Sequence, residues 1–259
     1  MNIMLGSDAE IFLKKDGELV SAYGVIEGTK SCPFQVKNGA AWQVDGMAAE
    51  LNPPPSSTEE EWLFSIQDVM AQLKASIPDY ELAIQPVAEF GKEFIAAQPD
   101  EAIELGCEAD YNAWLSKRNE APESDSFRTG AGHVHIGWTT NQDPEANRSM
   151  GEQLVKQLDF FLGLPSLLFD TDEKRRSLYG KAGAYRVKPY GVEYRTLSNQ
   201  WLTSPSLMSL IFNNTKAAVD SLMTGTNLWE EHGDIQHIIN CSRKDEAIGI
   251  MESAGICYE

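Results

Sequence analysis

Apolar and polar positions alternate over the first fifty residues of the chain, with Ala9, Ile11 and Leu13 as one apolar set. Alternation with a period of two is typical of half-buried strands. Asp16-Gly17 and Asp45-Gly46 are turn sequences that join such strands into hairpins. The sequence therefore predicts two hairpins, whose strands cover residues 9–13, 18–22, 41–44 and 47–52.

Apolar repeats at helical spacing follow the hairpins. Ser57 and Glu60 form a predicted capping box at the start of the first helix. Asp143-Pro144 and Ser204-Pro205 predict two more helix starts, because proline suits the first helical position. These two helices are predicted to run to about residues 163 and 225.

The remaining segments complete an α+β pattern. Strands are predicted over residues 80–90 and 191–198, a turn followed by a strand over 129–138, a basic loop over 174–188, and short helices from 234 onward. Because the hairpins and the long helices occur in separate blocks, we expect an α+β domain around a largely antiparallel sheet.

The charge of the chain excludes several classes of function. Asp and Glu total 39 against 21 Lys and Arg, giving a formal net charge of -18. Such a surface repels phosphate backbones and anionic lipid, so we expect neither a nucleic-acid partner nor a membrane partner. The first residues lack the basic and apolar regions of a signal peptide, and we expect a cytoplasmic protein.

Four predicted strands carry polar residues two positions apart, which places both side chains on one face. The pairs are Asp8/Glu10, Glu50/Asn52, His133/His135 and Glu193/Arg195. A single pair is most simply the solvated face of a strand. Together, the four carboxylates and two imidazoles on one sheet form a polar surface that is costly to bury without a cation. The combination predicts a metal site.

Two metals fit this set of residues. His133 and His135 with Glu10 or Glu193 would suit zinc in a hydrolase. The excess of carboxylates instead suits magnesium, which proteins usually hold together with substrate phosphates.

A basic segment supplies the complement for phosphate. Residues 174–188 together with Arg195 hold seven of the 21 basic residues, in a chain that is otherwise strongly acidic. Alone, the segment could be a solvated loop. Its arginines, however, can bind phosphoryl oxygens in a bidentate manner. Carboxylates, a divalent metal and arginines together favour phosphoryl transfer, and the P-loop, Rossmann and nucleophile-elbow motifs do not occur.

These residues resemble a known family in their order along the chain. Asp8-Ala9-Glu10, Glu50, Gly130 to His135, Arg186 and Val192 to Arg195 are similar to the motifs of the glutamine synthetase and glutamate-cysteine ligase superfamily. More narrowly, residues 44–53 and 179–186 resemble the phage-associated carboxylate-amine (COOH-NH2) ligases, type 2. The resemblance covers about residues 6–201.

The resemblance implies one glutamine-synthetase-like domain over residues 1–259, with C-terminal helices over 204–259. It implies an antiparallel sheet forming an active-site funnel, ATP with Mg2+ or Mn2+ as cofactors, and amide formation through an acyl phosphate. It also implies roles for site residues. The implied metal ligands are Asp8, Glu10, Glu50, His133 and Glu193; the implied nucleotide-binding residues are His133, His135, Lys181, Arg186 and Arg195; the implied catalytic residues are Arg176, Arg186 and Arg195.

The implied partners are a carboxylate-bearing and an amine-bearing substrate, each a small molecule or a peptide. No motif specifies either one, or an oligomeric state. If the chain is phage-encoded, the compartment is the host cytoplasm. Two other functions stay open at this point, namely the zinc-dependent hydrolase and a non-catalytic binding protein on the same fold.

Overall fold

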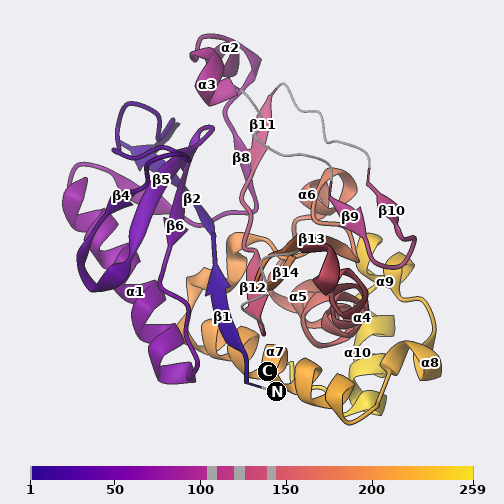
Figure 1. Cartoon of the computed structure of the whole chain (residues 1–259). Helices are drawn as coiled ribbons and strands as arrows, with labels where there is room; N and C mark the ends of the chain where they lie inside the picture. Colours follow the sequence, from indigo (N-terminus) through magenta and orange to yellow (C-terminus); the bar gives the residue numbers. More distant parts are fainter. Residues whose placement is uncertain (1, 104–109, 120–125, 139–143, 259) are drawn as a thin grey trace.

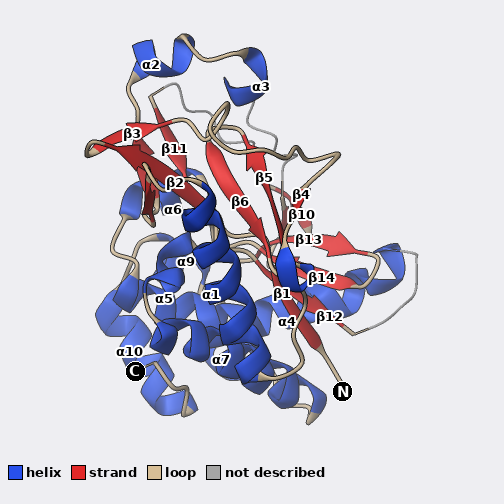
Figure 2. Cartoon of the chain, turned by 90° about the vertical axis from the view of Figure 1, so that its left-hand side faces the viewer, coloured by secondary structure: helices blue, strands red, loops and turns tan. Residues whose placement is uncertain are grey.

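The computed structural model describes residues 2–103, 110–119, 126–138 and 144–258. Within these ranges the strands form two six-stranded sheets and a two-stranded ribbon, and all their pairings are antiparallel. Helices pack around them (Figures 1 and 2). The predicted α+β class with antiparallel sheets is confirmed.

The first sheet has the strand order β1-β12-β14-β13-β9-β10. Its strands are β1 (Met4–Ser7), β12 (Val134–Gly137), β14 (Gly191–Tyr194), β13 (Ala184–Lys188), β9 (Tyr111–Asn112) and β10 (Lys117–Arg118). Its central strands β12, β13 and β14 carry buried apolar residues toward the helices, including Ile136, Val192 and Tyr194.

The second sheet contains both predicted hairpins. Its strands are β3 (Glu18–Val20), β2 (Glu10–Lys15), β6 (Ala48–Asn52), β5 (Ala41–Asp45) and β4 (Phe34–Gln35) in spatial order, with β7 (Glu81–Ala83) also paired to β2. Lys15 pairs with Glu18, and Asp45 pairs with Ala48, so both hairpins close where the turn sequences predict. The ribbon consists of β8 (Val87–Glu89) and β11 (Phe127–Thr129).

Three long helical stretches cover the sheets. These are α1 (Glu59–Ser76), α7 (Pro205–Met223), and a continuous run of a 3-10 helix (Pro144–Asn147), α4 (Arg148–Leu158), a π-helical turn (Asp159–Gly163) and α5 (Leu164–Phe169). The capping box of α1 is formed by Thr58 and Glu61, one residue later than predicted. Ser204 caps α7 as predicted. Asp143 lies outside the described residues.

The remaining helical segments are shorter, and α2 and α3 stand apart from the long helices (Figure 1). They are α2 (Lys92–Ala96), α3 (Asp100–Ile103), α6 (Glu173–Leu178), α8 (Leu228–His232), α9 (Gln236–Asn240), α10 (Lys244–Ala254), and two 3-10 helices over Lys37–Gly39 and Asn199–Thr203. Among the described residues, none of the helices combines the length and apolar character that a membrane span requires.

The two largest apolar clusters stabilise this arrangement. In the larger one, Trp62 of α1 stacks on Trp201 with ring centroids 5.6 Å apart, and Phe212 of α7 packs beside them. In the smaller one, Phe160 and Leu164 pack against Ile239 of α9 and Met251 of α10. The C-terminal helices therefore anchor onto the π-helical turn and α5.

Three sequence predictions are wrong in detail. The strand predicted over 80–90 is interrupted at Pro86, which cannot donate a ladder hydrogen bond, and becomes β7 and β8. The strand predicted over 191–198 ends at Tyr194. The basic segment 174–188 is not a loop, because it contains helix α6 and strand β13.

The two sheets meet where the chain passes from β1 to β2. Ser7 ends β1 in the first sheet and Glu10 begins β2 in the second. The same crossing is tied to the segment before β12, because the Glu10 amide donates to the carbonyl oxygen of Ala131 at 2.8 Å. Polar residues from both sheets converge here.

Candidate active site

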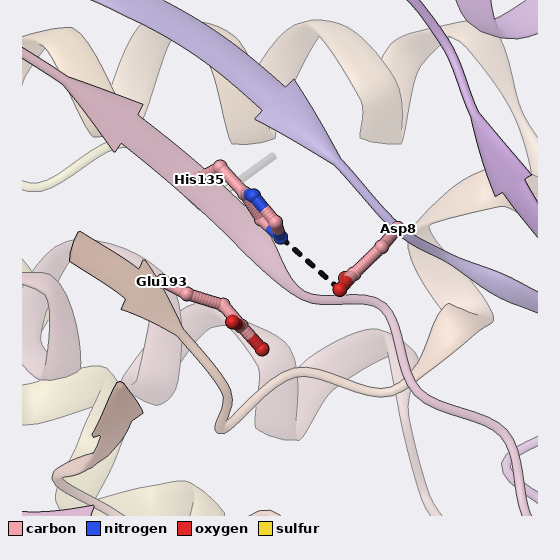
Figure 3. A group of neighbouring side chains, drawn as sticks. All are labelled: Asp8, His135 and Glu193. Atoms are coloured by element: carbon pink, nitrogen blue, oxygen red, sulfur yellow. Dashed lines mark ion pairs between the residues drawn. The ribbon is translucent and has the colours of Figure 1, made fainter. Parts of the chain in front are cut away.

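Asp8 lies at this crossing and contacts both histidines of the His-x-His strand. Its Oδ1 is 3.1 Å from Nδ1 of His133. Its Oδ2 is 3.2 Å from Nε2 of His135, and Figure 3 shows this second pair. Burial favours the neutral carboxyl group, but the two imidazoles outweigh it and hold the pKa of Asp8 well below its usual value. Asp8 therefore carries a negative charge in the interior.

Glu193 joins these residues from the neighbouring strand. Residues His135 and Glu193 are direct cross-strand partners on β12 and β14, and Oε1 of Glu193 lies 3.4 Å from Nδ1 of His133. Burial and the charge of Asp8 raise the pKa of Glu193, yet Arg195 and the histidines lower it further, to about 2. One ligand atom from each of Asp8, His135 and Glu193 lies within 4.8 Å of the others.

A second group of carboxylates lies beside the first. Glu10 of β2 faces Glu50 of β6 across the strand pair, and Asp45 at the end of β5 completes a group whose ligand atoms lie within 4.8 Å of one another. Burial, followed by the charge of Asp45, raises the pKa of Glu10 to about 8. Burial and the charge of Asp8 raise the pKa of Glu50. Repulsion among the three carboxyl groups, together with burial, therefore favours the neutral forms of Glu10 and Glu50.

This donor set fits hard divalent cations. Six side chains supply five carboxylates and one imidazole, and oxygen-rich sites of this kind suit Mg2+ or Mn2+. Nε2 of His135 is buried without a hydrogen-bond partner among the described residues, although it faces Asp8. A cation at each group would satisfy this atom and relieve the carboxylate repulsion.

Basic side chains surround the same carboxylates. Arg195 pairs with Glu193 through Nη1, with the Tyr179 hydroxyl through Nη2, and with Asp110 through Nε at 2.6 Å. Lys188 Nζ lies 2.6 Å from Oε2 of Glu193. Arg186 Nε lies 3.6 Å from Asp110, with its side chain 28% exposed, so it stands at the accessible edge.

Two glycines, Gly130 and Gly132, permit this close packing. A Cβ atom on Gly132 would lie 2.2 Å from the carbonyl oxygen of Ser198 and 2.4 Å from Nε1 of Trp201. Any side chain there would push the chain that carries His133 away from the segment after β14. The Gly-Ala-Gly run before His133 therefore has a packing role.

The structure brings together most of the residues predicted to form a site. Asp8, Glu10, Glu50, His135 and Glu193 belong to the two carboxylate groups, and His133 contacts Asp8 and Glu193. Arg186 and Arg195 are among the basic side chains beside them. Three pairs do not lie wholly on strands as predicted, because Asp8 precedes β2, His133 precedes β12 and Arg195 follows β14.

Arg176 and Lys181 lie elsewhere. Arg176 is buried and donates to the carbonyl oxygens of Asp170 and Ser166. Its described partners therefore belong to the helical layer, not to the carboxylate groups. Lys181 is half-buried, and its described contacts use its carbonyl oxygen, which accepts from the Thr196 hydroxyl at 3.0 Å.

Sequence reasoning missed five residues of the site: Asp45, Asp110, Tyr179, Lys188 and Tyr190. The Asp45-Gly46 dipeptide was interpreted as a hairpin turn, which it is, but that turn also places a carboxylate beside Glu50. Tyr179 and Lys188 belong to the segment rich in glycine and basic residues, from which only contacts with phosphate were expected. Asp110 carried no local signal.

Two cavities of about 800 Å³ each border the site. One is lined by His135, Tyr190, Trp138, Met4 and Pro55, among other residues, and so touches the first group. The other is lined by Asp45, Lys30, Tyr23, Thr29 and Glu101, among others, and so touches the second group. Each carboxylate group therefore has its own access from solvent.

Comparison with known families agrees with this chemistry. Residues 117–236 match the model of a family of carboxylate-amine ligases, which supports an enzyme of the ligase kind. The family is described as phage phiEco32-like COOH.NH2 ligase, type 2, and the match confirms the resemblance found in the sequence. The matched segment contains His133, His135, Arg186, Glu193 and Arg195. A search of curated proteins finds no match to the chain.

Proposed function

We propose that the protein is an ATP-dependent carboxylate-amine ligase that forms an amide through an acyl phosphate. The observation that carries the proposal is the presence of two neighbouring carboxylate groups, one of which contains Asp8. Arg195, Arg186 and Lys188 lie beside them. Phosphoryl transfer needs this combination, because it depends on positioning and on neutralising charge. The match to a ligase family supports the same class of reaction.

The two groups would hold divalent cations that neutralise the phosphate oxygens of ATP. Asp8, His135 and Glu193 would hold one, and Glu10, Asp45 and Glu50 the other, with His133 beside the first. Apolar and aromatic residues line the cavity next to His135, which makes it the better site for the nucleotide base. The two sheets would then form the walls of a funnel, as in glutamine-synthetase-like enzymes.

The acid and the amine would approach from the opposite side. The cavity beside Asp45 has charged and hydroxyl groups at its wall, including Lys30, Glu101 and Thr29. A substrate there reaches the second carboxylate group without crossing the first cavity. We therefore assign this cavity to the substrates that become joined.

The reaction has two steps in this account. A carboxylate oxygen of the acid attacks the γ-phosphorus, the bond to the β-phosphate oxygen breaks, and ADP leaves. The amine nitrogen then attacks the acyl carbon, the carbon–oxygen bond breaks, phosphate leaves, and the nitrogen loses a proton. Arg186 and Arg195 would stabilise negative charge on the phosphoryl oxygens, with paired donors that a lysine lacks.

The zinc hydrolase is less well supported by the geometry. A zinc site of two histidines and a carboxylate would need both imidazoles to face one ion. Nδ1 of His133 instead lies 3.2 Å from Nη1 of Arg195, a cation that repels a metal ion at that position. Among the described residues, the group around Asp8 thus offers one imidazole.

The proposal is tested by measuring ADP formation with a panel of acids and amines. We expect ADP release to require ATP and a cognate acid, with amide product appearing when the amine is added.

Arg186→Lys should lower turnover about a hundredfold, the usual loss for one preorganised donor, while ATP affinity changes less. The matched control is Arg243→Lys, which replaces an exposed arginine paired with Glu246 near α10. Amide formation without ATP would refute the ligase, and equal rates in both variants would remove Arg186 from the catalytic residues.

A further inference from the structure

Both ring nitrogens of His135 have a defined neighbour. Nε2 faces Oδ2 of Asp8 at 3.2 Å, and Nδ1 lies 2.6 Å from the hydroxyl oxygen of Tyr190. The two rings also stack, with centroids 6.0 Å apart and planes 16° from parallel. The rotation of the imidazole and its plane are therefore both constrained by Tyr190.

The scaffold in turn fixes Tyr190. It lies in the tight turn between β13 and β14, where its carbonyl oxygen accepts from the Trp138 amide at 2.9 Å. The Asn147 side chain donates to the carbonyl oxygens of Lys188 and Pro189, at 2.8 and 3.1 Å. A turn held by the residue after β12 and by the 3-10 helix before α4 can position a hydroxyl group accurately.

We infer that Tyr190 is a positioning residue that makes His135 present an unprotonated Nε2 to the cation of the first group. The inference rests on the proposed function, since it requires a cation there. A neutral imidazole has one N–H and one lone pair. A metal takes the lone pair of Nε2, so Nδ1 carries the hydrogen and donates it to the Tyr190 oxygen.

The same tyrosine also belongs to the neighbouring cavity. Its ring lines the wall together with Trp138, whereas its hydroxyl points to His135. Burial, with the charges of Glu193 and Asp8, raises the pKa of the Tyr190 phenol, so the hydroxyl stays neutral. Tyr190→Phe removes the hydroxyl and keeps the ring, which separates the two contributions.

Manganese binding tests the inference without relying on activity. The Mn2+ affinity of the full chain is measured by the loss of the free-ion electron paramagnetic resonance signal. Partners of metal-bound histidines typically contribute a tenfold to hundredfold change in affinity, so Tyr190→Phe should weaken Mn2+ binding about tenfold or more. Tyr111→Phe is the matched control, because this half-buried tyrosine lies on β9 of the same sheet and its hydroxyl contacts Arg118.

The outcomes separate the two proposals. If the wild type binds Mn2+ and Tyr190→Phe binds it equally well, the inference about Tyr190 is wrong while the metal site stands. If the wild type binds no Mn2+, the proposed metal chemistry fails and the inference fails with it.

The Nδ1 hydrogen of His135 gives a second readout. The chain has four histidines, so long-range proton–nitrogen spectra of the side chains can be assigned by substitution. With Mg2+ bound, we expect the Nδ1 hydrogen of His135 to exchange slowly with solvent in the wild type, because the Tyr190 oxygen accepts it, and to exchange faster in Tyr190→Phe. Equal exchange rates in the two proteins would overturn the inference.

Discussion

Glu10 and Glu193 are the same chemical group with opposite pKa shifts, and their neighbours explain the difference. Burial raises both pKa values. Next to Glu10 stands the negative charge of Asp45, whereas Arg195 and the histidines stand next to Glu193. At neutral pH and without metal, Glu10 therefore keeps a proton that Glu193 has lost. A divalent cation would take the place of that proton.

The pKa of Glu10 predicts how the stability of the metal-free protein depends on pH. Because the folded pKa is raised to about 8, the contribution of Glu10 is intact below about pH 4.5 and is lost as pH rises toward 8. We expect the free energy of unfolding in EDTA to fall over this window. Glu10→Gln should remove much of the fall, and added Mg2+ should stabilise the wild type at pH 8 more than it stabilises this variant.

Urea unfolding at several pH values measures this effect. Glu18→Gln is the control, because Glu18 is exposed on β3 of the same sheet. If Glu10→Gln and the wild type lose stability in parallel between pH 5 and 8, the electrostatic account of the second carboxylate group is incorrect.

At the scale of elements, the π-helical turn between α4 and α5 holds a buried carboxyl group. Asp159 accepts hydrogen bonds from Nε1 of Trp114 at 2.6 Å and from the Tyr194 hydroxyl at 2.7 Å. Burial outweighs these bonds and raises the pKa of Asp159 to about 7. The turn thus links the first sheet to the helices through the hydrogen bonds of Asp159.

Asp159→Asn should change the pH dependence of stability separately from the metal site. With a raised folded pKa, Asp159 contributes stability below about pH 3.8 that is lost as pH rises through about 7. The asparagine cannot ionise, so the variant should lose less stability than the wild type between pH 5 and 7.5. It should also be less stable than the wild type at pH 5, because its amide opposes the Trp114 donor. Thermal unfolding across this range decides the point, and an unchanged slope would contradict it.

Elements with strong local signals could be predicted from the sequence. The hairpins were found because their turn residues require positive φ, with Asp16 at 53° and Gly46 at 56°. The start of α7 was found because Ser204 and Pro205 are a cap and a first-turn residue. In both cases neighbouring residues carry the information.

Tertiary contacts account for what could not be predicted. A run of basic residues suggested a ligand-binding loop, yet Arg175 is buried and donates to the carbonyl oxygens of Thr196 and Leu197. Arg176 likewise satisfies backbone carbonyls. No local pattern distinguishes an arginine that binds backbone from one that binds phosphate.

The sequence predicted those parts of the site in which side chains alternate along a strand. Same-face spacing correctly brought His135 and Glu193 to one place, because they pair across β12 and β14. Asp110 lies just before the short strand β9 and Tyr190 lies in the turn between β13 and β14, and neither position carries a periodic signal. Their positions depend on how the strands of the first sheet pair with one another.

At the scale of the whole molecule, the site occupies the junction of the two sheets. Asp8 connects β1 and β2, so a shift of one sheet against the other would move the two carboxylate groups apart. The main apolar cluster, with Trp62 of α1 stacked on Trp201, holds helices from both sides together. The net charge of -18 further favours cations near the site.

The most direct test of the account is calorimetric titration of the full chain with ATP, in Mg2+ and in EDTA. The account predicts saturable ATP binding that requires the divalent ion and is weakened in Glu193→Gln, which removes one ligand of the first group without altering the cavity beside it. Glu18→Gln should bind as the wild type does. Binding of equal strength in EDTA, or no binding in Mg2+, would contradict a metal-dependent nucleotide site and with it the proposed ligase.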